Sequence, residues 1–294
     1  MAKTKYNFVG RDHLPWRWIW IPILACLPRT GFPSSVYTLS SGNSAVAIDT
    51  ASQTGMNNWT VDGQNQLNQQ WFWYRVGSSG PEASIDTIGM PTVNQLSANI
   101  LNTSYASSQF SVSVLYSLVG GASGSGVSDV SETITIQNLT SSSLSFHFFQ
   151  YADFDLGGTP NNDTAHLDQS GTSSTYSGVV QYNNGGCRVS ENVDTVVSQS
   201  ASRAQVATDN SLLAALNNLT PTTLTDNTSC AGNVKWALEW DKTIARGGTL
   251  IISKDMNIDG VPQVTGVPEP PAWSLLSSTG MIAWGLRKRL RRAR

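Results

Sequence analysis

Charge is scarce in this sequence of 294 residues, of which only 13% are Asp, Glu, Lys or Arg. Between residues 36 and 266, seven basic side chains are outnumbered by 18 acidic ones, so this stretch lacks the positive surface that a nucleic-acid partner requires. Phosphate-binding glycine loops and dinucleotide fingerprints are also missing. Ser123 lies in a glycine-rich stretch that misses the G-x-S-x-G nucleophile motif, because Ser125 occupies the position of the final glycine. The stretch is better interpreted as a hairpin loop.

Aromatic residues are plentiful, with 10 Trp, 8 Tyr and 8 Phe, and they supply enough apolar surface for a folded core. Large apolar residues alternate with polar ones over 110–118 and again over 234–241, which is the pattern of half-buried strands. Short strands separated by Gly, Asn and Ser turns predict an all-β, antiparallel β-sandwich over residues 36–258. At most one short helix is expected, near 202–219. Two hairpins are predicted, 133–137 with 144–151 and 236–244 with 249–254.

Basic charge is concentrated at the two ends of the chain, each time beside an apolar stretch, which is a membrane-topology pattern. Residues 1–35 begin with basic side chains followed by the apolar segment 16–27, and predict an export signal region. Residues 259–266 are interpreted as a linker. Three features follow in order: the motif Val267, Pro268, Glu269, Pro270; an apolar helix over 272–286; and the basic residues Arg287, Lys288, Arg289, Arg291, Arg292 and Arg294.

Together, residues 267–294 resemble the PEP-CTERM sorting signal of Gram-negative bacteria. The resemblance implies recognition of Pro268, Glu269 and Pro270 by an exosortase partner. It also implies a transient inner-membrane anchor through the C-terminal helix 272–286, and then release to the cell surface or extracellular matrix. An association with extracellular polysaccharide and biofilm is implied as well. On this basis the chain is expected to be an exported structural or interaction protein and not an enzyme, with no catalytic residues of its own.

One loop of the body combines oxygen ligands with glycines. Asp153, Asp155, Asn161 and Asp163 follow an aromatic strand, and carboxylate and amide oxygens are the ligands that Ca²⁺ prefers. Asp and Asn also favour turns through local hydrogen bonds, which accounts for the same residues without a cation. Cys187 and Cys230 are the cysteines of the predicted mature chain, and export would permit a disulfide between them. Two reduced thiols are the alternative.

Two further functions stay open from the sequence. A carbohydrate-binding sandwich would use the aromatic run 71–74 as a stacking platform, although alternation sends at least one pair of these rings into the core. Glycoside hydrolysis would need two facing carboxyl groups, and nothing selects a pair from the acidic residues. His147 and His166 do not form a metal-ligand pattern by spacing. The carboxyl groups considered for hydrolysis are those of Asp153, Asp155, Glu191 and Glu239.

Overall fold

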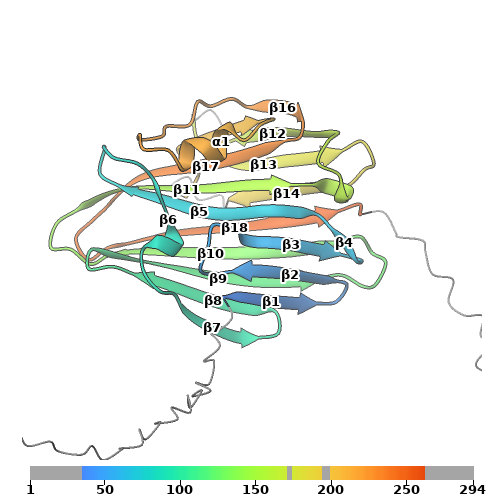
Figure 1. Ribbon diagram of the computed structural model, residues 1–294, viewed down its shortest axis with the longest axis horizontal. Coiled ribbons are helices and arrows are strands. Elements are labelled where there is room, and N and C mark those ends of the chain that lie inside the picture. The colour runs from blue at the N-terminus through green and yellow to red at the C-terminus, as the bar shows by residue number, and fades with distance from the viewer. Residues whose placement is uncertain (1–34, 171–173, 194–198, 262–294) are drawn as a thin grey trace, which may run out of the picture. The chain divides into compact units, whose positions relative to one another are not determined.

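The computed structural model describes residues 35–170, 174–193 and 199–261, which form two stacked β-sheets (Figure 1). The predicted all-β sandwich is therefore confirmed. Sheet A has nine strands, and two of them, β4 and β6, pair only at its side. In spatial order its strands are β1 (Val36–Ser41), β2 (Ser44–Asp49), β3 (Gly55–Val61), β5 (Leu67–Val76), β11 (Leu144–Phe154), β17 (Lys235–Ile244) and β15 (Arg203–Ala207), with β4 (Gln64–Asn65) beside β3 and β6 (Ala83–Ser84) beside β5.

Sheet B also has nine strands, and all its pairings are antiparallel. Sheet A is antiparallel too, apart from a short parallel contact between β3 and β5. In spatial order the strands of sheet B are β16 (Ser229–Gly232), β12 (Asp163–Gln169), β13 (Tyr176–Asn183), β14 (Arg188–Val193), β18 (Thr249–Asp259), β10 (Ser128–Asn138), β9 (Phe110–Gly120), β8 (Ile100–Ala106) and β7 (Thr92–Ser97).

The core between the sheets is built by the apolar faces that alternation predicts. Phe72 and Phe148 stack with their ring centroids 5.4 Å apart, and Phe148 lies 6.1 Å from Trp240. These rings belong to the neighbouring strands β5, β11 and β17, and all three are completely buried. From sheet B, aliphatic residues such as Ile134 and Ile252 close the core. Large rings and branched aliphatic residues thus pack against one another between the two sheets.

Both predicted hairpins are wrong, although the strands themselves are present. β10 lies in sheet B and β11 in sheet A, and in the same way β17 lies in sheet A and β18 in sheet B. Turn residues indicate that the chain reverses, but they do not say whether it stays in one sheet or passes to the other. The chain thus passes from one sheet to the other after β10 and again after β17, and these two connections are called the corners below. Asn138 joins them: its Nδ2 donates to the carbonyl oxygens of Ile244 and Ala245, each at 3.0 Å.

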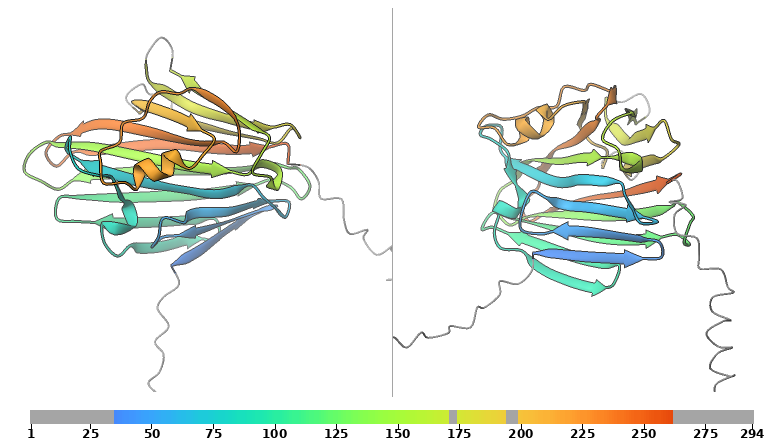
Figure 2. Two further views of the ribbon diagram at one scale, coloured as in Figure 1. Left: turned by 45° about the horizontal axis from the view of Figure 1, so that its top comes forward. Right: turned by 45° about the vertical axis from the view of Figure 1, so that its right-hand side comes forward.

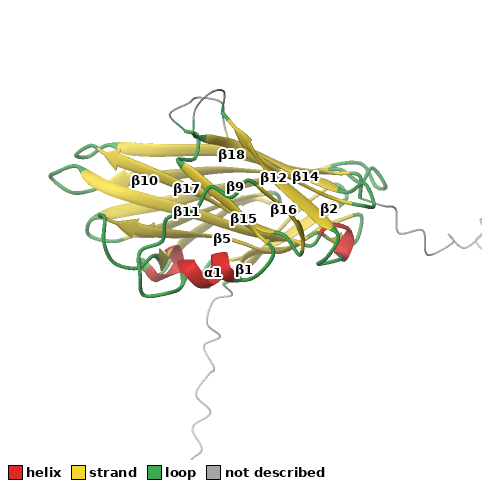
Figure 3. Ribbon diagram, turned by 90° about the horizontal axis from the view of Figure 1, so that it is seen from above, coloured by secondary structure: helices red, strands yellow, loops and turns green. Residues whose placement is uncertain are grey.

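The predicted helical region is half strand and half helix. Residues 203–207 form β15, and the helix α1 covers only Ser211–Leu216, with Leu212 and Leu216 buried. Within the described ranges, two 3₁₀ turns complete the helical content, η1 (Ile85–Thr87) and η2 (Leu156–Gly158). α1 lies on the outer side of sheet A, as two further views show (Figure 2), and helix is a small part of the molecule (Figure 3). The segment 217–228, called the strap below, continues from α1 across the same face.

The predicted terminal signals fall outside the described residues. This holds for almost all of the export region 1–35, for the sorting motif 267–270, and for the apolar helix and basic tail of 272–294. They remain predictions from the sequence. Strand β18 ends at Asp259, one residue beyond the predicted end of the body. Within residues 35–170, 174–193 and 199–261, no helix has the length and apolar character needed to cross a membrane.

Candidate functional site

His147 marks a polar site on the outer face of sheet A. In β11 its neighbours Phe146 and Phe148 are buried, so His147 points to the opposite face, as the alternation predicts. The antiparallel register places His147 directly opposite Asp241 of β17. Glu239 lies two residues away on the same strand and therefore on the same face. Three ionisable side chains from two adjacent strands thus meet at one place.

The ligand atoms of the three side chains lie within 4.8 Å of one another. Nδ1 of His147 is hydrogen-bonded to Oδ1 of Asp241, and it lies 3.8 Å from Oε1 of Glu239. The side chain of Glu239 is 1% exposed, whereas those of His147 and Asp241 are 18% and 34% exposed. Within the described part of the chain, no hydrogen bond involves Nε2 of His147. The imidazole is therefore held through one nitrogen, and the other is available to a ligand.

The strap holds Glu239 in place from the outer side of sheet A. The backbone N–H of Leu224 donates to Oε2 of Glu239 at 2.9 Å. Thr222, two residues earlier, is held by a buried ion pair: its N–H donates to Oε1 of Glu82 at 2.9 Å, and its carbonyl accepts from Nη2 of Arg75 at 3.2 Å. Arg75 and Glu82 are themselves joined at 2.8 Å. Sheet, ion pair and strap together leave Glu239 little freedom to move.

Burial changes the protonation of the site. It raises the pKa of Glu239 to about 8, because the charged form loses its solvation; the N–H of Leu224 opposes the rise and the nearby Asp241 adds to it. Near neutral pH, Glu239 is thus mostly a protonated acid beside an imidazole that is oriented by a carboxylate. A proton donor and a proton acceptor in one site are what general acid–base catalysis requires.

The same three residues have the spacing of a metal-ligand set. Their ligand atoms all lie within 4.8 Å of one another, and among the described residues they form the one group of His, Cys, Asp and Glu with this property. One imidazole and two carboxylates suit a divalent transition metal. Spacing along the sequence does not place His147 in this group, because β11 and β17 come together through strand pairing.

Two of the predicted calcium ligands, Asp153 and Asp163, have protein partners. Oδ2 of Asp153 accepts from Asn68 at 3.0 Å, and its Oδ1 lies 3.7 Å from the ammonium of Lys235. Oδ2 of Asp163 accepts from Gln181 at 2.7 Å. Asn161 is exposed, and Asp155 is half-buried next to the turn η2. Turn geometry and a lysine account for these residues, and calcium binding stays a prediction.

The predicted disulfide is absent. Cys187 and Cys230 are both free, and Sγ of Cys187 lies 3.3 Å from Oε1 of Gln66. Cys230 is on β16, whereas Cys187 directly precedes β14, and two strands separate β16 from β14 in sheet B. Three strand spacings amount to about 14 Å, well beyond the Cα separation that a disulfide spans.

The aromatic run does not form an exposed platform. Trp71, Phe72 and Trp73 are completely buried, and Tyr74 is half-buried. Trp73 lies beneath the strap, where its Nε1 donates to Asn217 at 3.2 Å. Of the carboxyl groups considered for hydrolysis, Glu239 belongs to the site described above, and Glu191 lies inside the core. Asp241 was not predicted as a site residue. It could have been found from its position two residues after Glu239, because alternation places both side chains on the same face of a strand.

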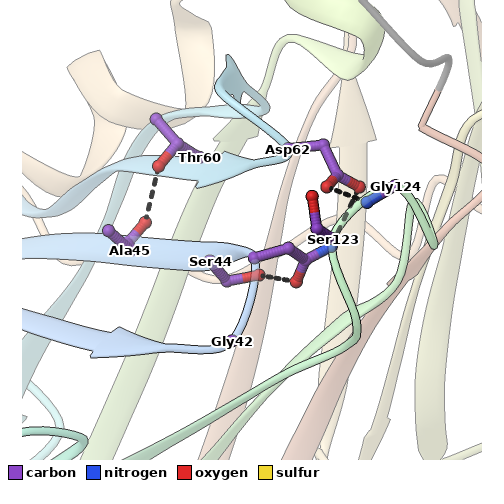
Figure 4. A pocket seen from close by; sticks show the side chains of 8 residues that line it. Gly42, Ser44, Ala45, Thr60, Asp62, Ser123 and Gly124 are labelled. Atoms are coloured by element: carbon purple, nitrogen blue, oxygen red, sulfur yellow. Dashed lines mark hydrogen bonds between the residues drawn. The ribbon is translucent and has the colours of Figure 1, made fainter. Parts of the chain in front are cut away.

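A hollow with a volume of about 490 Å³ lies among three turns at one end of the sandwich (Figure 4). Asp62 is its charged residue, and both carboxylate oxygens are engaged: they accept from the N–H groups of Gly124 and Gly126 at 2.6 and 2.8 Å. Ser123 lies in the same turn, in the hairpin loop between β9 and β10. Because Asp62 is used to hold that loop, the hollow is structural and is not the candidate site.

No family model matches the sequence, and no curated protein matches it. Solved structures match the fold at very low sequence identity. A galactose mutarotase related enzyme from Lactobacillus acidophilus is 8% identical with a TM-score of 0.54, covering 79% of this chain and all of its own. A galactose mutarotase-like protein from Clostridium acetobutylicum is 8% identical with a TM-score of 0.50, covering 76% of this chain and 94% of its own.

A bacterial glucoamylase in complex with acarbose is 7% identical with a TM-score of 0.52 over 78% of this chain, which spans about a third of the glucoamylase. These matches show that the chain has a galactose mutarotase-like β-sandwich fold. They correct the expectation of a structural surface protein that is processed by exosortase and has no enzymatic role, because the solved structures that share the fold include carbohydrate-processing enzymes.

Proposed function

We propose that this protein binds a carbohydrate at the His147 site and catalyses proton transfer on it. The observation that carries the proposal is the meeting of His147, Glu239 and Asp241 on the outer face of sheet A, with their ligand atoms within 4.8 Å of one another. The site combines a buried, protonated carboxyl group with an imidazole that is held by a carboxylate, and an isolated acid on a protein surface has neither feature. The arrangement provides both halves of an acid–base reaction.

The simplest reaction that such a site performs on a sugar is opening of an aldose ring. Nε2 of His147 takes the proton from the anomeric hydroxyl, while Glu239 gives its proton to the ring oxygen. The bond between C1 and the ring oxygen breaks, and the carbonyl of the open aldehyde forms. Closure on the other face of that carbonyl returns both protons and yields the other anomer. No co-reactant is needed, because the reaction only moves protons.

The solved structures with this fold support a carbohydrate ligand. Two of the matches with a TM-score of at least 0.50 are named for galactose mutarotase, and a third is a glucoamylase with acarbose bound. Their sequence identities are below 10%, so their residue roles are not transferred. The choice of ring opening rests on the residues of this chain, and the names of the neighbours favour a sugar as the substrate class.

Polarimetry of freshly dissolved α-anomers of glucose and galactose tests the proposal. The full-length protein should accelerate mutarotation, and His147→Ala or Glu239→Gln should lower the rate by about 10²–10⁴-fold. His166→Ala is the matched control, since His166 is exposed on β12 of the other sheet. The rate should fall as pH rises through about 8, because Glu239 then loses the proton it donates.

Two outcomes would contradict this account. A wild-type protein that neither accelerates mutarotation nor binds mono- or oligosaccharides in calorimetry would remove the proposed function. Acceleration that EDTA abolishes, and that a divalent transition metal restores, would show that His147, Glu239 and Asp241 act as metal ligands. Activity that persists in EDTA is the result we expect from proton transfer.

A further inference from the structure

A second group of ionisable residues lies in the core of the sandwich. Lys254, Glu132 and Glu191, here called the core ionic cluster, have side chains with 0% exposure. They belong to the inner face of sheet B, between the aromatic rings of sheet A and the aliphatic residues of their own sheet. Removing three charges from water is expensive, and replacement by apolar residues is often neutral or stabilising. The cluster therefore calls for a chemical explanation.

Strand register brings the three residues together. Lys254 of β18 is directly opposite Glu132 of β10. On the other side of β18, Glu191 of β14 pairs with Met256, one inward-facing position from Lys254. Nζ of Lys254 is in direct contact with Oε2 of Glu132, and it lies 3.7 Å from Oε2 of Glu191. One amine thus lies between two carboxyl groups on its two neighbouring strands.

Sheet A closes the cluster from the opposite side. Nε2 of Gln70 donates to Oε2 of Glu132 at 3.2 Å, and Nε2 of Gln150 donates to Oε2 of Glu191 at 2.7 Å. The ring of Phe72 lies 5.5 Å from Nζ of Lys254. Within the described residues, the second carboxyl oxygens, Oε1 of Glu132 and Oε1 of Glu191, have no hydrogen-bond partner. The contacts orient the reacting atoms and exclude bulk water.

A dry environment favours the uncharged forms of these groups. Burial raises the pKa of Glu132, although Lys254 and Gln70 oppose the rise, and burial raises the pKa of Glu191 to about 7. When a proton passes from the ammonium to the carboxylate, the ion pair becomes a neutral amine beside a neutral carboxylic acid. A neutral amine is a nucleophile, and the carbon of a protonated carboxyl group is its electrophile.

We propose that Lys254 and Glu132 condense to an intramolecular amide, a covalent cross-link between β18 and β10, with Glu191 as the group that transfers protons. Nζ of Lys254 attacks Cδ of Glu132, and a C–N bond forms. Glu191 accepts a proton from the nitrogen and delivers it to the departing hydroxyl oxygen. The C–O bond breaks, one water leaves, and Glu191 returns to its first state. The reaction needs no oxidant, reductant or further reactant.

The cross-link would have a mechanical consequence. β18 is the last strand of the described chain and lies in the middle of sheet B, between β14 and β10. Without the amide, a pull on the end of β18 is resisted only by hydrogen bonds and packing. With the amide, the pull is transmitted directly to β10. The cross-link is independent of the proposed reaction on sugars, which takes place on the outer face of the other sheet.

Mass spectrometry of the denatured full-length protein tests the inference. The wild-type chain should weigh less than its sequence by the mass of one water. Its trypsin digest should contain one branched peptide that joins the segments around Glu132 and Lys254, with no cleavage after Lys254. In Lys254→Met, Glu132→Ala and Glu191→Ala the water should be retained and the branched peptide lost. Lys235→Met is the matched control, because Lys235 is also a buried lysine near a carboxylate, Asp153.

The wild-type peptide map decides the question even if a variant fails to fold. Cleavage after Lys254 in the denatured wild-type chain, together with recovery of linear peptides containing Glu132 and Lys254, would overturn the proposal. A branched peptide that still forms fully in Glu191→Ala would leave the cross-link standing and refute the role given to Glu191. Loss of the cross-link in Lys235→Met would also contradict this account.

Discussion

At the scale of single residues, Asp163 shows how burial governs an acidic side chain. Burial raises its pKa to about 6, although hydrogen bonds from Gln181 and the N–H of Leu156 oppose the rise. The folded state therefore binds the proton more tightly than the unfolded chain, whose carboxyl has an ordinary value of 3.8. The free energy of unfolding should therefore decrease as pH rises from about 4 to 6, and it should stay lower above that range.

The substitution Asp163→Asn removes the loss of stability that ionisation of Asp163 causes above pH 4. At pH 7.5 the variant should have a free energy of unfolding about 2–3 kcal/mol higher than that of the wild type, and at pH 4 the difference should vanish. Urea unfolding at the two pH values measures both quantities. Asp168→Asn, on the same strand and half-buried, is the control and should show little effect. Calcium that raises the melting temperature of the wild type, but not of Asp163→Asn, would instead support the predicted calcium loop.

At the scale of structural elements, the strap depends on a buried ion pair. The side chains of Arg75 and Glu82 are 4% and 0% exposed, and together they hold Thr222. Glu82→Ala leaves a buried guanidinium without its partner and should lower the free energy of unfolding by about 3–5 kcal/mol. Hydrogen exchange at the amides of Thr222 and Leu224 should accelerate, since both N–H groups depend on the position of the strap.

A second ion pair at the strap is exposed, and it serves as the comparison for the buried pair of Arg75 and Glu82. Arg203 and Asp226 are also 2.8 Å apart, but their side chains are 42% and 36% exposed. Asp226→Ala should therefore cost no more than about 1 kcal/mol. Equal losses for Glu82→Ala and Asp226→Ala would show that burial does not govern the strength of these pairs in this protein.

Asn138 controls how the two sheets are joined. Its Nδ2 donates to Ser142, Ile244 and Ala245, and the side chain is completely buried. Asn138→Ala removes the donor from carbonyl oxygens at both corners and leaves that of the buried Ile244 without it, so we expect a loss of about 2–4 kcal/mol in the free energy of unfolding, measured by thermal or urea unfolding. Asn94→Ala on the exposed face of β7 should be neutral. A neutral Asn138→Ala would mean that the corners are held by strand packing alone.

Alternation predicted the strands well, because a strand that is buried on one face must repeat every two residues. It placed His147 correctly on the face opposite Phe146 and Phe148. It failed at the corners after β10 and β17, since passage between sheets depends on packing that a local sequence does not encode. Only part of the candidate site could be predicted from the sequence, for a similar reason. Glu239 was considered for hydrolysis, but its partners are defined by the register of β11 against β17.

At the scale of the whole molecule, the two faces of each sheet have different chemistry. The outer face of sheet A carries the proposed acid–base site, in which the side chains of His147 and Asp241 reach solvent. The inner face of sheet B carries the core ionic cluster, from which water is excluded. Both groups combine an amine or imidazole with two carboxyl groups. Exposure separates their expected reactions: an open site can exchange a ligand, whereas a closed site can react only with itself.

The order of strands in sheet B predicts which truncation the fold tolerates. β18 lies between β14 and β10, so its removal divides sheet B into two separate parts and takes the buried residues Ile252, Met256 and Ile258 out of the core. A fragment of residues 35–261 contains every described strand and should unfold cooperatively. A fragment of residues 35–246 lacks only β18 and the corner before it, yet it should not fold. Circular dichroism and thermal melting of the two fragments distinguish these results. Cooperative melting of the shorter fragment near the same temperature would show that the central place of β18 is not required for the stability of the sandwich.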